Sequence, residues 1–234
     1  MRRARPVVAI DGPAGAGKST VTKLVAQALG YLLVDTGALY RTVALAARRS
    51  GLDFDDVEPV GALAEALAAR GAVALSGDAS GVRVLLDGED VSALIRTQEL
   101  GQGASKVSAQ PRVRAALLEL QRAAGRAGGV VLEGRDIGTV VFPDAEAKLF
   151  LTASVDERAR RRFEQLKRSG EPADLEAVTR EVVERDRRDS TRPIAPLKQA
   201  ADAVVVDSST LGIEQVVERI VSHVRGVEAR LAGR

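Results

Sequence analysis

The chain has 234 residues, of which 45% are hydrophobic and only 3% aromatic, so the core of its folded domain must consist of Ala, Val, Leu and Ile. The 34 Lys and Arg nearly balance the 32 Asp and Glu, and a net charge of +2 does not indicate a nucleic-acid-binding surface. Cysteine is absent, which excludes disulfides and thiolate metal sites and is typical of a reducing cytoplasm. The apolar run after the basic N-terminus ends at Asp11, too early for a secretion signal or a membrane span. We therefore expect one soluble, cytoplasmic α/β domain.

The first motif lies between a strand pattern, Val7–Ile10, and a helix pattern, Lys18–Leu29. It fits the phosphate-binding pattern GxxxxGK[ST], which predicts as ATP-binding residues Gly12, Pro13, Ala14, Gly15, Ala16, Gly17, Lys18, Ser19 and Thr20. In such a loop, backbone N–H groups and the helix N-terminus face a polyphosphate, and the lysine contacts the β- and γ-phosphates. Ser19 would offer its hydroxyl to Mg²⁺. A glycine-rich turn that fits by chance is the alternative, but strand, loop and helix in this order favour a nucleoside triphosphate site.

Further along the chain, short apolar runs predict four more strands, at Leu32–Val34, Val130–Glu133, Lys148–Leu151 and Ala203–Val206. Helical patterns alternate with them, including apolar stripes within residues 113–124 and 213–224. This alternation predicts a mostly parallel sheet of about five strands with helices on both faces. We expect residues 227–234 to form a frayed tail after the last helix.

Two regions interrupt the alternation. Residues 53–103 begin with a helical pattern and continue as short strands around residues 77–81, which predicts an antiparallel insert composed of Val60–Arg70, Ala72–Leu75, Val82–Leu86 and a turn at Asp87–Asp90. Residues 156–196 are dense in charge. If helical, Arg158 and Arg162 share one face, as do the residues Arg185, Asp189 and Arg192. Such runs are usually solvated faces, but arginines on a mobile flap would close over a triphosphate and exclude water.

The segment Asp35–Arg41 follows the second predicted strand, and ligands bind at this edge of open parallel sheets. A helix beginning near Gly37 would present Thr36 and backbone N–H groups, with Arg41 one turn later. An ordinary helix cap followed by a surface arginine is the alternative interpretation.

The segment Glu133–Thr139 follows another predicted strand. Arg135 would direct two N–H groups at a phosphate, and Asp136 would accept from an exocyclic amine, as carboxylates do from the cytosine amino group. Glu133 would serve the magnesium shell through water. The alternative is a structural ion pair between Arg135 and Asp136, but glycines on both sides favour close approach of a ligand.

Taken together, the motifs resemble the bacterial cytidylate kinase family. The resemblance runs in order from Pro6 to Val224 and is carried by residues 12–20, 35–41, 88–92 with 95–98, 111–114, 134–136 and 184–189. It implies a P-loop nucleoside monophosphate kinase fold in a single domain, with the core at about 1–52, 104–155 and 197–227. The insert at about 53–103 would bind the monophosphate, and residues at about 156–196 would form the lid. In that family Asp or Ala commonly stands where this chain has Glu133.

The resemblance also implies the reaction and the roles of the site residues. ATP with Mg²⁺ would donate its γ-phosphoryl group to CMP or dCMP, in pyrimidine nucleotide recycling, by a protein that we expect to be a monomer. Cytosine would be read by Thr36, Ser105, Arg114 and Asp136, with Tyr40 also in the acceptor site. The ribose would be held by Arg185 and Asp189, and the acceptor phosphate by Arg41, Arg135 and Arg192. Transfer itself would be assisted by Lys18, Arg135, Arg158, Arg162 and Arg192. Ser105 rather than Ser108 is assigned from its distance to Pro111.

Other functions explain the sequence less well. Adenylate, uridylate, shikimate and dephospho-coenzyme A kinases share the donor loop, and only the acceptor motifs distinguish them from this chain. A GTPase would need an Asn-Lys-x-Asp guanine reader, and the chain contains no Asn. A nucleic-acid-binding ATPase would need a basic stripe with stacking aromatic residues, which is not visible. We expect His223, near the end of the final helix, to be a surface residue.

Overall fold

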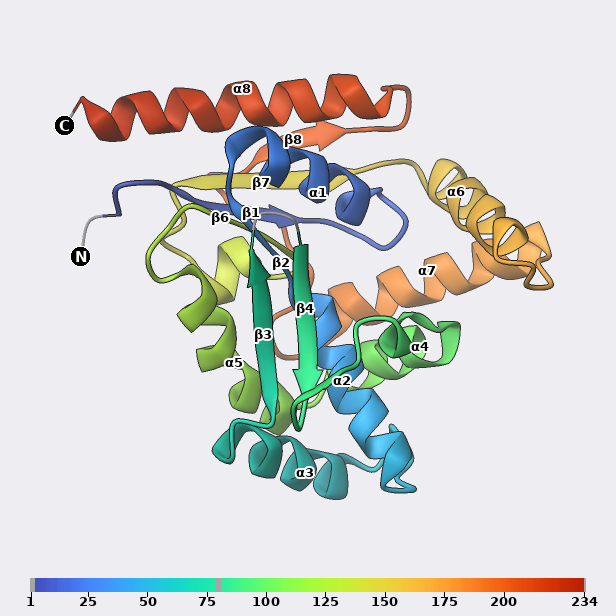
Figure 1. Cartoon of the computed structure of the whole chain (residues 1–234). Coiled ribbons are helices and arrows are strands. Elements are labelled where there is room, and N and C mark those ends of the chain that lie inside the picture. Colours follow the sequence, from blue (N-terminus) through green and yellow to red (C-terminus); the bar gives the residue numbers. More distant parts are fainter. Residues whose placement is uncertain (1–2, 79–80, 234) are drawn as a thin grey trace.

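The computed structural model describes residues 3–78 and 81–233. In chain order, its elements are β1 (Val7–Asp11), α1 (Lys18–Leu29), β2 (Leu32–Asp35), α2 (Thr36–Arg49), α3 (Val57–Ala69), β3 (Val73–Asp78), β4 (Gly81–Leu86), β5 (Glu89–Asp90), the 3₁₀ turn η1 (Leu94–Arg96), α4 (Gln98–Val107), α5 (Pro111–Gly125), β6 (Val130–Gly134), the π-helical turn η2 (Ile137–Val141), β7 (Ala147–Thr152), α6 (Val155–Arg168), α7 (Leu175–Thr191), β8 (Val204–Asp207) and α8 (Ile213–Ala232) (Figure 1).

The predicted parallel sheet is confirmed. Its five strands lie in the order β2-β6-β1-β7-β8, and every neighbouring pair is parallel. All five strands continue one residue beyond the predicted C-terminal end, to Asp11, Asp35, Gly134, Thr152 and Asp207. These additional residues are polar or glycine, so a hydropathy pattern stops before the backbone ladder does. The edge strand β8 leaves two apolar side chains, Val204 and Val205, exposed.

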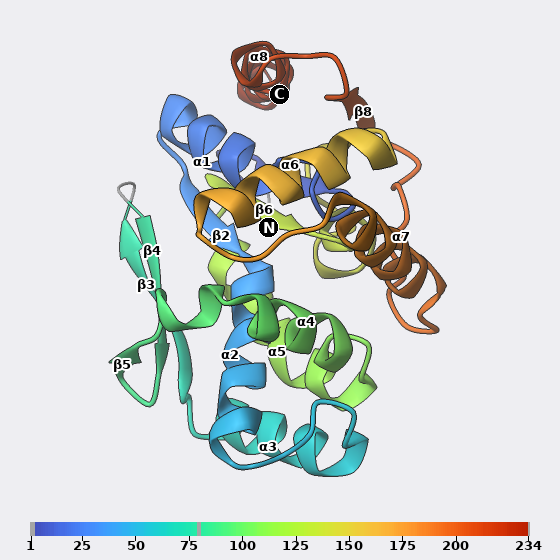
Figure 2. The same ribbon diagram turned by 90° about the vertical axis from the view of Figure 1, so that its right-hand side faces the viewer.

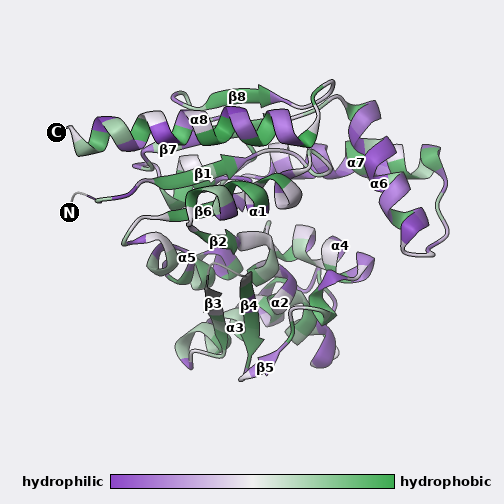
Figure 3. Cartoon of the chain, turned by 45° about the horizontal axis from the view of Figure 1, so that its top comes forward, coloured by the Kyte–Doolittle hydropathy of each residue, from purple (hydrophilic) through white to green (hydrophobic). Residues whose placement is uncertain are grey.

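Helices cover both faces of the central sheet, as the alternation predicted. On one face, α1 and α8 pack over β1, β7 and β8, and the two helices lie on the same side in both views (Figures 1 and 2). The largest buried side chains on that face are Tyr31, Ile10, Leu149, Leu151 and Ile220. On the other face, η2 and α5 cover β1, β2 and β6 around Leu132 and Ile137. The strands of the central sheet are accordingly among the most hydrophobic segments of the fold (Figure 3).

The predicted antiparallel insert is also present. Strands β3, β4 and β5 form a separate sheet in that order, below the central sheet in Figure 1. One face of this small sheet shares a hydrophobic core with α2, α3, α4 and α5. The tight turn between β4 and β5 is formed by Asp87 and Gly88, both with positive φ. The turn expected around residues 77–81 includes residues 79–80, which lie outside the described part of the chain.

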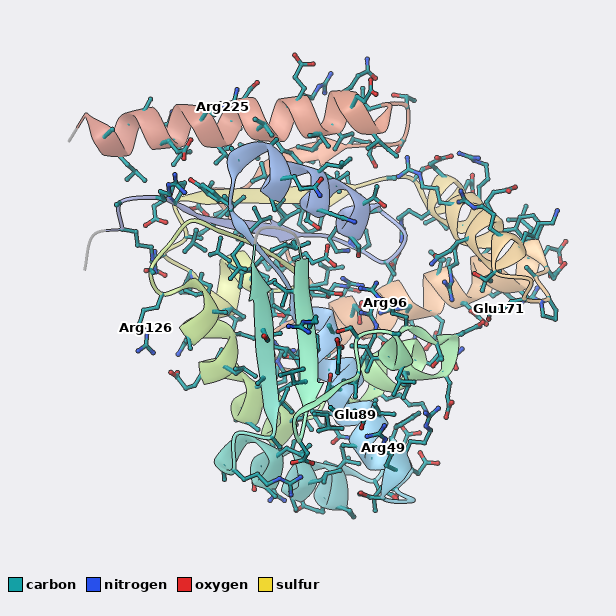
Figure 4. All side chains as sticks on the ribbon, viewed as in Figure 1. Arg49, Glu89, Arg96, Arg126, Glu171 and Arg225 are labelled. Atoms are coloured by element: carbon teal, nitrogen blue, oxygen red, sulfur yellow. The ribbon has the colours of Figure 1, made fainter. Side chains whose placement is uncertain are left out.

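Two salt bridges tie this region together at its outer end. Arg49, at the end of α2, contacts Glu89 of β5 through Nη1–Oε2 at 2.7 Å, and the two residues lie together in Figure 4. Arg48 contacts Glu99 of α4 at the same distance. The boundary that the sequence suggested after residue 103 lies inside α4, and the domain boundaries remain predictions.

The charge-dense region folds into α6 and α7, a helical hairpin that projects from one end of the central sheet (Figures 1 and 2). The two helices are held together by a small core of their own, consisting of Ala159, Leu166, Val178 and Val182. Their outer surfaces are strongly hydrophilic (Figure 3).

Three local predictions need correction. The helix expected at Val60–Arg70 begins earlier, at Val57. The tail expected at residues 227–234 is not frayed over residues 227–232, because α8 continues to Ala232 and buries Val227 against the core. Residue 234 lies outside the described part of the chain. His223 consequently lies well inside α8 rather than near its end, where it is half-buried and burial lowers its pKa.

Two isoleucines of α8 test this arrangement. Ile220 is fully buried, whereas Ile213 on the same helix is 52% exposed. We expect Ile220→Ala to lower the free energy of unfolding by about 2–5 kcal/mol, because it removes buried methyl groups and leaves a cavity. Ile213→Ala should change it by no more than about 0.5 kcal/mol. Urea denaturation of both variants measures the difference, and equal losses would contradict the placement of α8.

Candidate active site

The register of the central sheet brings three polar segments to one edge. Asp11, which leads into the glycine-rich loop, is paired with Gly134, and Asp35 is paired with Glu133. Because parallel strands end on the same side, the three loops that follow β1, β2 and β6 meet there. The sequence motifs 12–20, 35–41 and 133–139 are therefore neighbours in space.

The glycine-rich loop is packed too closely for a side chain at its first glycine. A Cβ added to Gly12 would lie 1.9 Å from the carbonyl oxygen of Leu151 in β7. Lys18 folds back over the loop, where its Nζ donates to the carbonyl oxygens of Gly12 and Pro13, both at 2.7 Å. Burial, followed by the charge of Arg135, lowers the pKa of Lys18 below its ordinary value. An anion in the loop would therefore stabilise the charged lysine.

The N-terminus of α1 faces the same loop without a compensating group. Gly17 stands at the cap position, and among the described residues no side chain accepts from the first N–H groups, nor does the first turn contain an acidic residue. Helix α2, in contrast, is capped by Asp35, which accepts from the Ala38 N–H at 3.2 Å. The positive end of α1 thus remains available to an anion.

Glu133 is buried beside this helix and accepts from two of its hydroxyls. Ser19 donates to Oε1 at 2.8 Å and Thr22 donates to Oε2 at 2.7 Å. Burial, followed by the charge of Asp35, raises the pKa of Glu133. A hydroxyl and carboxylates around a phosphate loop form the hard oxygen set that Mg²⁺ prefers. Within residues 3–78 and 81–233, no group of three or more His, Cys, Asp or Glu is placed to hold a metal ion unaided.

Asp11 joins the glycine-rich loop to the segment after β6. Its two carboxylate oxygens accept from the backbone N–H groups of Ile137 and Gly138, each at 2.8 Å. Asp136 immediately precedes these two residues, so its position depends on this anchor. Burial raises the pKa of Asp11 to about 6, against the opposing effect of the two N–H donors.

Asp136 is buried between two arginines. It contacts Arg114 of α5 through Oδ2, and Arg192 donates to Oδ1 at 3.2 Å. Burial raises the pKa of Asp136, although Arg114 and Arg192 oppose the shift. Its partner is therefore not Arg135, and the ion pair considered as an alternative for the 133–139 segment does not form.

Arg135 instead contacts helix α7. Its Nε donates to Asp189 at 2.9 Å, and Arg185, one turn earlier on α7, reaches the same carboxylate oxygen at 4.0 Å. Burial raises the pKa of Asp189, but Arg135 and Arg185 outweigh it and lower the pKa below its ordinary value. Burial and the charge of Arg135 also lower the pKa of Arg185 to about 10. Guanidinium groups thus outnumber carboxylates in this part of the site.

Three predicted site residues lie on α2, namely Thr36, Tyr40 and Arg41, and each contacts a different part of the site. Thr36 is buried and donates to the backbone oxygen of Glu133 at 2.8 Å. The guanidinium of Arg114 lies over the ring of Tyr40, with its carbon 5.6 Å from the ring centre. The hydroxyl of Tyr40 is buried and has no hydrogen-bond partner among the described residues. Arg41 turns back to Asp35 at 3.1 Å. Helix α2 begins at Thr36, one residue before the expected Gly37, and its cap is Asp35.

An open hollow of about 490 Å³, solvent included, lies beside Arg41, between α2 and the small sheet. One of its polar lining residues is Arg96 of η1, which belongs to the motif 95–98 but was given no role in the sequence analysis (Figure 4). Its other lining residues are Leu33, Asp35, Ala38, Leu75, Val82, Val84, Ser92 and Ile95.

Ser105 is the predicted base reader on α4. Its hydroxyl accepts from Arg188 of α7 at 3.1 Å, which links the helix after the insert to the hairpin. Ser108, the alternative candidate, donates instead to the backbone oxygen of Ser105. Arg188 was not predicted, because its contact joins residues 83 positions apart and leaves no local pattern.

The arginines of α6 differ in what they contact. Arg158 is buried and donates to the Ala14 carbonyl oxygen of the glycine-rich loop at 3.1 Å. Arg162 donates only to Gln165 on its own helix, at 3.0 Å, among the contacts of the described residues. Arg161, which the sequence did not single out, donates to the backbone oxygen of Ser208 at 2.6 Å and lies beside Gly17. The spacing of the arginines in α6 does not distinguish the helix face that carries Arg158 and Arg162 from the face that carries Arg161, so it could not have identified Arg161.

Comparison with known proteins agrees with this geometry. The family model described as "Cytidylate kinase" matches residues 8–226, which is nearly the whole chain. The chain belongs to the cytidylate kinase family. The prediction that it is a kinase of this family is confirmed, whereas the roles of individual site residues remain predictions.

The family includes relatives that cover almost the same length. A protein of Citrifermentans bemidjiense named "Cytidylate kinase" is 54% identical over 94% of this chain and 92% of its own. One of the same name from Pseudomonas paraeruginosa is 52% identical over 95% of this chain and 96% of its own. In a solved structure of an uncharacterized protein from Eubacterium ventriosum, the fold is similar, with a TM-score of 0.52 at 12% identity over 94% of this chain and 99% of that one.

None of the described helices combines the length and apolar character that a bilayer span requires.

The buried Asp11 predicts a pH dependence of stability. Its pKa of about 6 in the folded protein lies above the ordinary value of 3.8, so the folded state binds more protons between these pH values. The free energy of unfolding should therefore fall by on the order of 3 kcal/mol as the pH rises from about 4 to about 6, and then remain constant above about 7. Urea denaturation across this range, comparing the wild type with Asp11→Asn, isolates the effect. Identical pH profiles for the two proteins would exclude it.

Proposed function

We propose that this member of the cytidylate kinase family transfers the γ-phosphoryl group of ATP to CMP or dCMP. The observation that carries the proposal is the position of Asp136. This buried carboxylate lies between Arg114 and Arg192, and Asp11 ties its loop to the glycine-rich loop. A base-reading group and a phosphate loop in one site are what a kinase for a nucleoside monophosphate needs. Names of the relatives support the same acceptor.

On the donor side, the triphosphate would occupy residues 12–20. Backbone N–H groups at the uncapped N-terminus of α1 would bind the phosphate oxygens. Lys18 would release the carbonyl oxygens of Gly12 and Pro13 and donate instead to the β- and γ-phosphates. Arg158 already lies against this loop and would contact the same group. For Arg162, such contact would require a change from its present position beside Gln165.

On the acceptor side, Asp136 would accept a hydrogen bond from the cytosine amino group, while Arg114, Thr36 and Ser105 would complete the reading of the base. The ribose would lie against Arg185 and Asp189. Arg135, Arg41 and Arg192 would bind the acceptor phosphate, which would take the place of the carboxylates that they contact now. Tyr40 would support the base site from below Arg114.

Magnesium fits the donor side. Ser19 would ligate it directly and Glu133 through water, with the phosphates of ATP as the remaining ligands. When bound, the ion would neutralise charge on the β- and γ-phosphates. Glu133 is longer than the Asp or Ala that the family commonly has at this position, and its carboxylate accepts a hydrogen bond from the Ser19 hydroxyl. This hydrogen bond would have to break for Ser19 to ligate the ion.

The chemistry needs little proton transfer. An oxygen of the CMP phosphate attacks the γ-phosphorus, a new O–P bond forms, and the bond to the β-phosphate oxygen breaks to release ADP. Because the nucleophile is already anionic, the protein contributes alignment of the two phosphates and stabilisation of the charge that spreads over the equatorial oxygens. The α6–α7 hairpin would exclude water, which competes as acceptor. We place the reaction in cytoplasmic recycling of pyrimidine nucleotides.

A substrate panel tests the proposal. ADP release from ATP is measured with CMP, dCMP, UMP, AMP, shikimate and dephospho-coenzyme A offered in turn, with magnesium present and then chelated. CMP and dCMP should give the fastest rates, chelation should abolish them, and hydrolysis of ATP without acceptor should be much slower. If AMP is the best acceptor, the chain acts as a different nucleotide kinase and the proposal fails.

Lys18 allows a sharper test of the donor side. We expect Lys18→Ala to reduce kcat with CMP by about 10²–10³-fold, because it removes a charge that contacts the transferred group. The matched control is Lys23→Ala, which removes an exposed lysine from the same helix and should retain the wild-type rate. Unchanged circular dichroism would show that both variants fold. A Lys18→Ala enzyme with wild-type turnover would exclude the assigned role.

A further inference from the structure

Arg158 makes three contacts that together join separate parts of the site. Its side chain is only 5% exposed. Nε donates to the Ala153 carbonyl oxygen at 2.9 Å, Nη1 donates to that of Ala14 at 3.1 Å, and Nη2 contacts Asp186 Oδ2 at 2.6 Å. A guanidinium carries five N–H groups, so two of them are not used in these contacts.

The packing around Arg158 leaves little freedom between α6 and the glycine-rich loop. A Cβ added to Gly15 would lie 3.0 Å from the Cβ of Arg158 and 3.1 Å from its carbonyl oxygen. Gly15 also has a φ of 77°, a conformation that other residues rarely adopt. This close packing fixes the backbone and the Cβ of Arg158. The direction of its guanidinium is set by its polar partners, of which Asp186 is the one that carries charge.

Asp186 belongs to a helix that also serves the acceptor side. It stands next to Arg185 on α7 and three residues before Asp189, whose carboxylate accepts from Arg135 at 2.9 Å. Its second oxygen, Oδ1, is buried and has no hydrogen-bond partner among the described residues. The carboxylate is thus held mainly by Arg158, and any shift of α7 on the acceptor side would move it.

A continuous chain of contacts follows from these positions. It runs from the glycine-rich loop at Ala14 through Arg158 to Asp186, then along one turn of α7 to Asp189 and on to Arg135 after β6. We propose that Asp186 is a positioning residue that holds Arg158 against the glycine-rich loop and thereby couples binding of the phosphate donor to binding of the acceptor. The inference rests on the proposed function, since it takes the two ends of this chain as donor and acceptor sites.

The coupling has a defined physical origin. Each ligand biases the position of α7, because an acceptor bound to Arg185 and Asp189 fixes the helix that orients Arg158 for the donor. Energetic coupling between two sites is reciprocal, so the donor must strengthen acceptor binding by the same factor. Asp186→Asn keeps the size of the side chain but removes the charge that attracts Arg158, and should reduce this factor.

Calorimetry on the full chain measures the factor directly. A non-hydrolysable ATP analogue with Mg²⁺ is titrated with and without saturating CMP, and CMP is titrated with and without the analogue. In the wild type, each ligand should strengthen the other by about fivefold or more. In Asp186→Asn, the factor should approach one and the Kd of the analogue should rise by about tenfold. The Kd of CMP alone should change by less than about twofold, and Asp186→Glu should restore part of the coupling.

The matched control is Glu184→Gln. Glu184 pairs with Arg187 on the same helix at 2.8 Å, and both residues are exposed, unlike the buried Arg158. Glu184→Gln should leave unchanged the Kd of the analogue with and without CMP and the Kd of CMP with and without the analogue. If Asp186→Asn folds poorly, Arg158→Ala is compared with Arg158→Ala/Asp186→Asn. Arg158→Ala already breaks the ion pair, so the second change should then alter the Kd of the analogue very little.

The possible results separate the two proposals. A wild type that binds no CMP refutes the proposed function. A wild type that binds both ligands with a factor of one refutes the coupling alone. Wild-type coupling in Asp186→Asn, or an equal loss of both affinities in that variant, refutes the positioning role of Asp186.

Discussion

The parallel pairing of β1 with β6 is the constraint on which the rest of the site depends. It sets Asp11 opposite Gly134, so the loop after one strand begins where the loop after the other begins. Asp11 then fastens the two loops by accepting N–H groups from Ile137 and Gly138. Everything that the helices add, including the arginines of α5, α6 and α7, is arranged around this junction. A shift of register by one residue would turn Asp11 to the opposite face of the sheet and separate the two halves of the site.

Electrostatic strain is the second property of the junction. Many guanidinium groups converge on few carboxylates, and burial makes their charges costly, as the lowered pKa values of Lys18, Arg185 and Arg192 indicate. The carboxylates of Asp136 and Asp189 relieve part of this repulsion. Phosphate groups would relieve more of it, because each brings negative charge and several acceptor oxygens to donors that are already in place. Such a site gains more from anion binding than a solvated one, since the desolvation has been completed during folding.

Much of this arrangement could be predicted from the sequence, and the parts that could not have a common cause. Residues such as Lys18, Arg135 and Asp136 stand in motifs of fixed spacing, and five apolar runs sufficed to predict the parallel sheet. Contacts between distant segments left no such pattern. Arg188 reaches Ser105 and Asp186 reaches Arg158 only because α7 packs against both α4 and α6. Strand ends were placed too early because polar residues finish the strands, and the last helix was ended too early because its final turns alternate exposed polar residues with few buried ones.

The separate core of the α6–α7 hairpin has a consequence for how the molecule opens. Its four buried side chains form a cluster that is separate from the three larger ones, so this unit contributes little to the burial that holds the sheet together. Its backbone amides should exchange with deuterated solvent through excursions that leave the strands protected, and much faster than those of β1 or β6. Replacing Val182 by a smaller residue would then loosen the hairpin while the midpoint of global melting hardly moves. Evolution can adjust the speed of such openings within this hairpin without endangering the remainder of the fold.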